Sequence, residues 1–326
     1  MDFTLSADQE ALRDGVRAFC ESRIPLARLR ELEGSGFDAV LWSELAELGV
    51  FGLLCEDTGA GAGPGLVAEA LVFEELGRCV APGPLLWTRL AMGLLPEAGS
   101  GDVVVTGLDL ECDPQGPFLL EHLSAAEIVL VLREEGVARI EAKSIDARPI
   151  GAPLDPFTPI HRVTSLPTGE LVADGATAER LRLEGTVLTA ALLLGIAEAT
   201  QALATRYALE RQQFDRPIGS FQAIKHLLAD CYVRQELARA SVYAAGVLLD
   251  EPDSPAARRA TAAAKLIAGE AAMKNSRACI QVHGGMGFTW ENPAHYFLKR
   301  TWVLENSFGT TARQAESLAA MITAEA

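Results

Sequence analysis

Two arginines and an aromatic residue lie on a loop between two long helical patterns, where they could bind a phosphate. Arg211, Phe214 and Arg216 follow a helical segment that ends soon after Tyr207, and a new helical pattern begins near Ser220. An arginine guanidinium is planar, permanently charged and able to donate paired hydrogen bonds to a phosphate. The first N–H groups of the following helix would also attract an anion. The alternative is an ordinary helix hairpin with two solvated arginines, which is common in helical bundles.

A second candidate ligand-binding segment is Gln281-Val-His-Gly-Gly-Met-Gly-Phe288. Gly284 and Gly285 lack a Cβ, so their backbone can approach a ligand closely and adopt positive φ. The side chain of Gln281 offers both a hydrogen-bond donor and an acceptor. His283, within the turn, could contact a cofactor or serve packing. The alternative is a helix C-terminus with a glycine stop and no ligand.

The patterns around these segments divide the chain into three parts. Residues 1–98 show helical periodicity, which begins after a capping-box pattern at Ser6–Gln9. Residues 99–178 contain short β-rich runs separated by turns with Pro and Gly, which predict a small β domain. Residues 179–326 are helical again, and long helices with short connections predict an up-down four-helix bundle.

The individual elements follow from the same periodicity. Helices are predicted at Phe37–Leu48, Leu66–Val80, Arg180–Leu209, Ser220–Leu249, Pro255–Gly284 and about Thr311–Met321, β-rich runs at Val103–Val105, Ile128–Leu132 and Val137–Ile140, and a glycine-rich loop at 57–65.

The composition argues against several classes of protein. The formal net charge is −16 and the sequence pI is about 4.8, which disfavours nucleic acid or an anionic membrane as a partner. The N-terminus is acidic and polar, unlike a signal peptide, and the longest apolar runs are too short to span a bilayer. The six cysteines form no C-x-x-C pair. We therefore expect a cytoplasmic protein with reduced thiols and no metal site.

The two candidate ligand-binding segments, taken together, resemble signatures of the acyl-CoA dehydrogenase family. These signatures are Y-A-x-x-R-x-x-F-(G)-x-P-I-x-x-F-Q and Q-x-x-G-G-x-G-(F/Y), and here they begin at Tyr207 and Gln281. Residues 3–53 and Glu74-Glu-Leu-Gly-Arg78 are similar to the family's opening helices and its E-E-L-G-R element. The resemblance implies an α+β fold with an N-terminal helical domain (1–98), a shortened central β domain (99–178) and a C-terminal four-helix bundle (179–326).

The resemblance also implies FAD as cofactor and assigns residues to it. In this family the matching residues contact the pyrophosphate, the adenosine and nearby parts of a FAD that is held mainly by the neighbouring subunit. The residues at these positions are Arg211, Phe214, Gln222, Gln281, Gly284 and Gly285. The site would therefore lie across a dimer interface. Asp215 stands where the family usually has Gly, and its carboxylate would weaken attraction of a phosphate if it pointed inward.

The family's catalytic base is missing from its usual position. In the family a desolvated Glu removes an α-proton from an acyl-CoA while hydride leaves the β-carbon for the flavin. That Glu precedes Gly-Thr near the C-terminus, and here the position is Phe308, which cannot accept a proton. Some relatives place the base at the start of the long C-terminal helix, which makes Glu184 a fallback. The alternative for Glu184 is a solvated carboxylate near a helix N-terminus. Glu305 is a weaker candidate.

The predicted β domain also departs from the family pattern. Neither the T-E-P-x-x-G-S-D loop nor the W-I-T-N strand, which grip the flavin ring in the family, occurs between residues 99 and 178. The resemblance therefore implies a short subunit of an α2β2 enzyme, similar to those of actinobacterial steroid catabolism. A larger catalytic paralogue would supply the base and the ring-binding domain, the substrate would be an acyl-CoA, and an electron-transferring flavoprotein would accept the electrons.

Two further hypotheses remain open. The chain could be a self-sufficient homomeric dehydrogenase that uses Glu184 as its base. It could also be a non-enzymatic scaffold or regulator that keeps the fold but binds no flavin. Flavin content of the isolated chain and of a co-purified pair separates all three.

Overall fold

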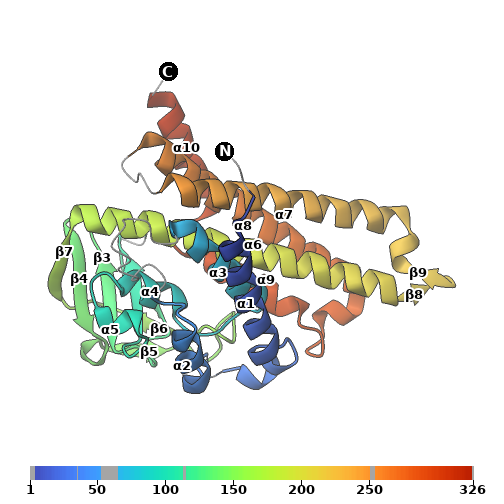
Figure 1. Ribbon diagram of the computed structural model, residues 1–326. Coiled ribbons are helices and arrows are strands. Elements are labelled where there is room, and N and C mark those ends of the chain that lie inside the picture. Colours follow the sequence, from blue (N-terminus) through green and yellow to red (C-terminus); the bar gives the residue numbers. More distant parts are fainter. Residues whose placement is uncertain (1–3, 35, 53–64, 113–114, 250–253, 325–326) are drawn as a thin grey trace. The chain divides into compact units, whose positions relative to one another are not determined.

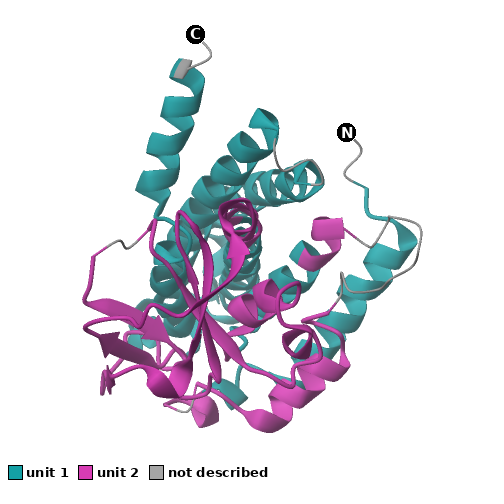
Figure 2. Ribbon diagram, turned by 90° about the vertical axis from the view of Figure 1, so that its left-hand side faces the viewer, with its two compact units in different colours: residues 1–29, 70–81, 187–326 teal, residues 30–69, 82–186 magenta. Residues whose placement is uncertain are grey.

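The computed structural model describes residues 4–34, 36–52, 65–112, 115–249 and 254–324 (Figure 1). The chain forms two compact units, each assembled from separate stretches of sequence (Figure 2). Unit 1 contains residues 1–29, 70–81 and 187–326, and unit 2 contains residues 30–69 and 82–186. Because the units are discontinuous, the three sequential domains with boundaries at 98 and 178 remain a prediction.

Unit 2 contains two small β-sheets. The first has the strand order β1-β3-β4-β7, with β1 (Val105–Asp109) parallel to β3 (Ile128–Leu132) and the β3–β4 (Gly136–Glu141) and β4–β7 (Glu170–Asp174) pairs antiparallel. The second has the order β2-β6-β5, with both pairs antiparallel; its strands are β2 (Phe118–Glu121), β5 (Ala147–Pro149) and β6 (Ile160–Val163). Every residue of β3 is buried, as its continuous apolar run indicates.

The strand prediction was correct for the buried runs and incomplete for the others. The run at 128–132 forms β3 and the run at 137–140 lies within β4. The run predicted at 103–105 begins later, because the Val103 N–H donates to the Glu97 carbonyl at 3.1 Å instead of entering the sheet. The strands β2, β5, β6 and β7 are partly exposed and were not predicted, although β2 contains the apolar run Phe118-Leu119-Leu120.

The helices of unit 2 are short. α2 (Ala39–Glu47) is capped by the Asp38 carboxylate, which accepts from the N–H groups of Val40 and Leu41, and the left-handed Gly49 follows its end. α4 (Leu85–Ala91) and α5 (Pro96–Gly99) follow the break at Ala81-Pro-Gly-Pro84, and the sequence prediction missed both. The predicted glycine-rich loop lies outside the described residues except for Gly65, where α3 (Gly65–Arg78) begins.

Unit 1 is helical. Its N-terminal helix α1 (Ala7–Arg23) begins with the predicted capping box, since the Ser6 hydroxyl accepts from the Gln9 N–H and the Gln9 side chain accepts from the Ser6 N–H. The C-terminal helices are α7 (Gln222–Leu248), α8 (Pro255–His283), α9 (Ala294–Asn306) and α10 (Thr311–Ala324), and α8 packs against the other three. The bundle was predicted, whereas α9 was not.

The long helix α6 (Gly175–Glu210) begins five residues earlier than predicted, because the Asp174 carboxylate accepts hydrogen bonds from the N–H and hydroxyl of Thr177. By length and composition α6 could cross a membrane. However, 78% of its most apolar window is buried inside the protein, as in the core helix of a globular fold.

Two glycines allow α3 and the C-terminal part of α6 to touch. A Cβ added at Gly77 would lie 2.1 Å from the Leu192 carbonyl oxygen, and one added at Gly195 would lie 1.9 Å from the Glu74 carbonyl oxygen. No side chain fits in either space, so the glycine of the E-E-L-G-R element is required for this helix crossing.

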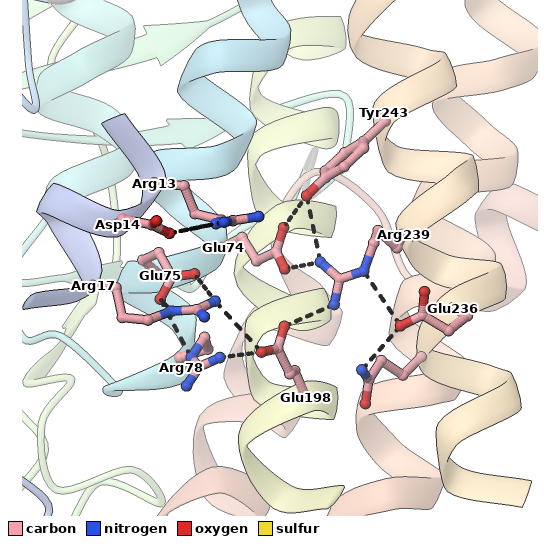
Figure 3. A network of polar contacts seen from close by, with 11 residues as sticks. Arg13, Asp14, Arg17, Glu74, Glu75, Arg78, Glu198, Glu236, Arg239 and Tyr243 are labelled. Atoms are coloured by element: carbon pink, nitrogen blue, oxygen red, sulfur yellow. Dashed lines mark hydrogen bonds and ion pairs between the residues drawn. The ribbon is translucent and has the colours of Figure 1, made fainter. Parts of the chain in front are cut away.

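The charged residues of the same element form a network beside the crossing (Figure 3). Glu74 accepts from the Tyr243 hydroxyl at 2.8 Å and pairs with Arg239, which also contacts Glu198 at 2.8 Å. Glu75 receives a bidentate pair from Arg17 at 2.6 and 3.0 Å, and Arg78 joins Glu75 to Glu198. Burial raises the pKa of Glu74 to about 7, although Arg239 opposes the shift.

This shift predicts a pH dependence of stability. A carboxyl whose folded pKa is raised keeps its proton in the folded state after the unfolded state has lost it. The stability that Glu74 contributes is therefore complete below about pH 4.5 and declines as the pH rises through 7. Between pH 5 and pH 8, the free energy of unfolding of the wild type should fall by about 2–3 kcal/mol relative to Glu74→Gln. Urea titrations at both pH values measure this difference.

Glu236→Gln is the matched control, because Glu236 lies at the exposed end of the network with 41% of its side chain accessible. It should leave the pH dependence of unfolding unchanged. An equal pH slope for wild type and Glu74→Gln would contradict the raised pKa of Glu74.

Candidate functional site

The first candidate ligand-binding segment, which contains Arg211, Phe214 and Arg216, forms a small hairpin between α6 and α7. Strands β8 (Gln212–Gln213) and β9 (Arg216–Pro217) pair antiparallel, and the Ile218 N–H donates to the Arg211 carbonyl at 2.8 Å to close the hairpin. The Arg216 guanidinium stacks on the Phe221 ring, 4.1 Å from its centroid. Phe214 lies at the tip with 85% of its surface exposed. The hairpin thus presents an aromatic side chain to the surroundings of the chain.

The guanidinium of Arg211 is available to a ligand. Arg211 is exposed, and among the described residues no side chain or carbonyl accepts from its guanidinium. Phe221 precedes α7, and no side chain caps the N-terminus of that helix. Uncapped N–H groups and a neighbouring arginine are the two elements that hold phosphates at helix N-termini. The alternative of two solvated arginines fits Arg211, whereas the guanidinium of Arg216 is stacked on Phe221.

The tip of the hairpin has a backbone conformation that favours glycine, the residue that the resemblance led us to expect in place of Asp215. Phe214 and Asp215 both have positive φ, 54° and 58°, which defines the two central positions of a type I′ turn. Glycine adopts this conformation without strain, whereas side chains at positive φ cost free energy, less for Asp than for most residues. Asp215 is exposed and adds a negative charge four residues from Arg211.

Asp215→Gly should therefore tighten the binding of a phosphate-bearing cofactor and stabilise the turn. We expect about 1 kcal/mol from relief of the turn strain, together with a gain in cofactor affinity that diminishes at high salt. Asp215→Asn is the matched control, because Asn tolerates positive φ and removes only the charge. Titration of cofactor fluorescence at low and high salt separates the two effects. Unchanged affinity in both variants would mean that the Asp215 carboxylate points away from the bound anion.

The second candidate ligand-binding segment, Gln281–Phe288, forms the end of α8 and the following turn. Gln281 is exposed in the last turn of α8, and Gly284 ends the helix with φ 59° and ψ −136°, a conformation restricted to glycine. A Cβ added at Gly284 or Gly285 would meet nothing within 4 Å, so open space lies above both backbones. The turn therefore ends the helix, as a glycine stop does, and it also leaves its backbone accessible to a ligand.

The structure brings the two segments together through a ring stack that the sequence analysis missed. The rings of Tyr207 and His283 stack with centroids 4.2 Å apart, and His283 is 4% exposed. His283 Nδ1 lies 2.7 Å from the Cys279 carbonyl oxygen and donates to it. Burial lowers the pKa of His283, and the charge of Arg206 adds to this effect although the hydrogen bond opposes it. His283 is therefore a neutral packing residue that joins the segments.

Gln222 lies at the first position of α7 and is exposed, with its side-chain nitrogen 3.1 Å from His226 Nε2. All six predicted cofactor residues are therefore exposed on unit 1; they are Arg211, Phe214, Gln222, Gln281, Gly284 and Gly285. An arginine, uncapped helix N–H groups, an amide and accessible glycine backbone form a donor set that fits a dinucleotide pyrophosphate. Buried polar groups or an enclosing cavity would be needed to bind the whole molecule, and these exposed residues offer only part of such a site.

The turn where the resemblance places the family's base carries the buried Phe308. Phe308 is 6% exposed, has φ 52°, and its carbonyl accepts from the Gln314 side chain at 2.9 Å. The buried Lys265 ammonium donates to the carbonyls of Leu304, Glu305 and Gly309 at 3.0–3.2 Å, and so holds both sides of the turn. Hydrogen bonds hold the backbone of this turn, and the side chain of Phe308 is a buried phenyl ring.

Glu305 does not replace the missing base. Its carboxylate accepts from both the N–H of Thr311, at 2.8 Å, and the hydroxyl of Thr311, at the start of α10. Glu305 is therefore a helix-capping residue.

Glu184 is buried, and the expectation of a solvated carboxylate near a helix N-terminus was wrong. Because α6 begins at Gly175, Glu184 lies well inside the helix, where it is 8% exposed. Its two oxygens contact Arg89 and Arg180, and the 2%-exposed Arg89 also contacts Glu69 at 2.5 Å. We call Glu69, Arg89 and Glu184 the unit 2 triad.

The unit 2 triad opposes a role for Glu184 as a catalytic base. Burial alone would raise the pKa of Glu184, but the two arginines outweigh it and lower that pKa below its ordinary value. Burial raises the pKa of Glu69 to about 7 despite the nearby Arg89, so the proton of the triad resides on Glu69. A general base in this reaction needs a raised pKa, whereas the pKa of Glu184 is lowered and both of its oxygens contact arginines.

Five cysteines lie in the described part of the chain, and all are free thiols: Cys20, Cys79, Cys112, Cys231 and Cys279. Within those same residues, no group of three His, Cys, Asp or Glu side chains could hold a metal ion.

Family models match both helical regions of the chain. The model for the acyl-CoA dehydrogenase N-terminal domain matches residues 6–103, and that for the acyl-CoA dehydrogenase C-terminal domain matches residues 177–323. Together the two models cover both candidate ligand-binding segments and the E-E-L-G-R element.

Individual proteins agree with this match. The chain is 34% identical over 301 residues to acyl-CoA dehydrogenase IpdE2 of Mycobacterium tuberculosis (strain ATCC 25618 / H37Rv), covering 90% of each chain. It is 33% identical to IpdE2 of Mycolicibacterium smegmatis (strain ATCC 700084 / mc(2)155), covering 98% of this chain and 100% of that protein. A solved Tcur3481-Tcur3483 steroid ACAD variant shares the fold, with a TM-score of 0.85 at 23% identity over 99% of both chains. This chain therefore belongs to the acyl-CoA dehydrogenase family.

Proposed function

We propose that this chain is a subunit of a heteromeric acyl-CoA dehydrogenase that completes a FAD site held by a larger catalytic partner. Bound FAD would accept the hydride that leaves the β-carbon of an acyl-CoA. The residues of this chain would bind and orient the cofactor: Arg211 and the α7 N-terminus would hold its phosphates, and Gln281 with the Gly284–Gly285 backbone would contact its neighbouring parts. The partner would supply the carboxylate that removes the α-proton.

The observation that carries this proposal is the exposure of the predicted cofactor residues. A site that binds FAD within one chain encloses most of the cofactor surface. Here the six residues are exposed on unit 1, and the Arg211 guanidinium has no acceptor among the described residues. An exposed cation beside an exposed aromatic side chain, Phe214, is typical of a surface that a partner covers.

The outer face of α7 supports the presence of a partner. From Gln222 onward this face carries large apolar side chains at helical spacing, of which Val233, Leu237 and Val247 are 56%, 58% and 41% exposed. Exposed apolar side chains that line up along one helix mark an interaction surface more often than a solvated one. Gln222, a predicted cofactor residue, lies on the same helix, so one partner could cover both.

The absence of a usable base supports a catalytic partner. Phe308 cannot accept a proton, Glu305 caps α10, and Glu184 is held ionised by two arginines. The hypothesis of a homomeric enzyme that uses Glu184 therefore lacks its central requirement. The hypothesis of a non-enzymatic scaffold is not excluded by these contacts, and flavin content decides it.

The finer parts of the proposal are the substrate and the other partners. We propose the CoA ester of a steroid fragment as substrate, an α2β2 assembly, an electron-transferring flavoprotein as electron acceptor and a cytoplasmic location. They rest on the resemblance of this short chain to paired subunits. The Tcur3481-Tcur3483 protein is described as a steroid ACAD, but at 23% identity it supports the fold alone.

The test is to purify the chain alone and after co-expression with a longer family member from the same organism. We expect the isolated chain to be colourless or poor in FAD, and the co-purified pair to be yellow with one FAD per heterodimer. A yellow, active homomer would overturn the proposal, and a stable pair without flavin would favour the scaffold hypothesis. Visible absorption spectra and released-FAD quantification distinguish these outcomes.

A further inference from the structure

We propose that a cavity between α1, the end of α3 and the C-terminal part of α6 is a binding site for an apolar monocarboxylate. We call it the α1–α6 cavity. It has a volume of about 470 Å³, and all its lining residues belong to unit 1. Cavities of roughly 300–1,000 Å³ hold small-molecule ligands when they combine apolar walls with a few convergent polar groups. This site is independent of the FAD proposal.

The floor of the α1–α6 cavity is apolar and contains small side chains. Cys20, Ile24, Cys79 and Leu203 are 3%, 1%, 7% and 8% exposed. The Cys79 thiol donates to the Leu76 carbonyl at 3.3 Å, and burial raises the pKa of Cys79 well above its usual value, so the thiol stays neutral. Ala199, which also lines the cavity, has only a methyl group and leaves room for a ligand. The floor therefore suits a hydrocarbon chain or ring.

Three arginines line the same cavity and retain hydrogen-bond donors. Arg17 uses Nε and Nη2 on Glu75, and Arg78 uses Nε and Nη1 on Glu75 and Glu198. In the described part of the chain, nothing accepts from Arg17 Nη1 or Arg78 Nη2. Arg206 is exposed and forms no ion pair with any described residue. Five N–H donors in a fork make an arginine with unused donors a natural partner for a carboxylate.

The charge of the lining favours one negative charge on the ligand. Two carboxylates line the cavity: Glu75 is engaged by Arg17 and Arg78, and Glu21 is exposed. With three arginines, the lining has one net positive charge on a chain whose formal net charge is −16. A phosphate ester would bring more negative charge than the lining balances, and a neutral lipid would leave the arginine donors unused. A single carboxylate on an apolar body matches both features.

Calorimetric titration of the full chain with decanoate tests the proposal, with decan-1-ol as the probe that lacks the charge. We expect decanoate to bind more tightly than decan-1-ol, because only the ionised carboxylate brings a negative charge to the arginines and can accept paired hydrogen bonds from one guanidinium. Arg206→Gln should weaken decanoate binding about tenfold, the effect of losing roughly 1.4 kcal/mol. Ala199→Phe should abolish binding of both probes by filling the cavity.

Two controls make the result specific to the α1–α6 cavity. Arg277→Gln removes an exposed arginine of α8 that does not line it, and Arg211→Ala removes a predicted cofactor residue. Both should leave decanoate affinity unchanged. The proposal fails if decanoate does not bind, if decan-1-ol binds equally well, or if Arg211→Ala weakens decanoate as much as Arg206→Gln does. Because Arg206 is exposed, its substitution remains informative even if Ala199→Phe does not fold.

Discussion

Replacing Arg211 by Ala is expected to strip FAD from the proposed complex of this chain with a catalytic partner. A hydrogen bond to a charged group contributes about 1.5–3 kcal/mol, which corresponds to an approximately 10- to 100-fold weaker affinity. The effect should be large because Arg211 is exposed and has no intrachain acceptor in the described residues, so its guanidinium is free to serve a ligand. Released-FAD quantification and visible absorption of the purified complex measure the loss.

The control for Arg211→Ala is Arg148→Ala, which removes an exposed arginine of β5 in unit 2. It should keep full flavin content. If Arg211→Ala also retains its flavin and activity, the hairpin does not bind the cofactor, and the scaffold hypothesis gains support. Activity should return in Arg211→Ala at high FAD concentration, because the substitution weakens binding and leaves the partner's base intact.

Replacing Arg89 by Met is expected to destabilise the protein by about 3–5 kcal/mol, the cost of removing one partner from a buried ion pair. Arg89 is 2% exposed and lies between the carboxylates of Glu69 and Glu184. Methionine is apolar and flexible, but it leaves two acidic groups in a region from which water is excluded. Protonation of Glu69, whose pKa is about 7, would relieve only part of this cost. Urea unfolding monitored by circular dichroism provides the measurement.

The variant that combines Arg89→Met with Glu69→Gln and Glu184→Gln separates charge from packing. It should recover most of the lost stability, because no uncompensated buried charge remains. Failure to recover would show that Arg89 matters through its shape and hydrogen bonds. Glu184→Gln alone should lower stability and leave kcat of the heteromeric complex unchanged. Loss of kcat with retained fold and flavin would identify Glu184 as the base and overturn the assignment of that role to the partner.

Much of the helical architecture was predictable because it depends on local patterns. The Ser6–Gln9 capping box, the stop at Gly49 and the limits of α7 and α8 follow from capping and periodicity within a few residues. The fully buried strand β3 was equally clear from its apolar run. The partly exposed strands β2, β5, β6 and β7 were missed because even the apolar segments of β2 (Phe118–Leu120) and β7 (Leu171–Ala173) are shorter than the runs of about four to eight residues that indicate a strand.

The candidate cofactor residues were predictable because two spaced motifs carried them, but the contact between the two motifs was not predictable. Tyr207 and His283 are 76 positions apart, and only folding reveals that their rings stack. The role of Asp215 likewise required the observed φ values, which place it in a type I′ turn that favours glycine.

The sequence alone determined that residue 308 is a phenylalanine, and no fold can give a phenyl ring a proton-accepting oxygen or nitrogen. Tertiary structure decided the fate of Glu184, because a carboxylate's pKa depends on burial and on neighbouring charges that are distant in sequence. Arg89 precedes Glu184 by 95 residues, and Glu69 lies still earlier in the chain. No local pattern could have indicated that Arg89 joins Glu69 to Glu184 in a buried triad, where Arg89 and Arg180 together keep Glu184 ionised.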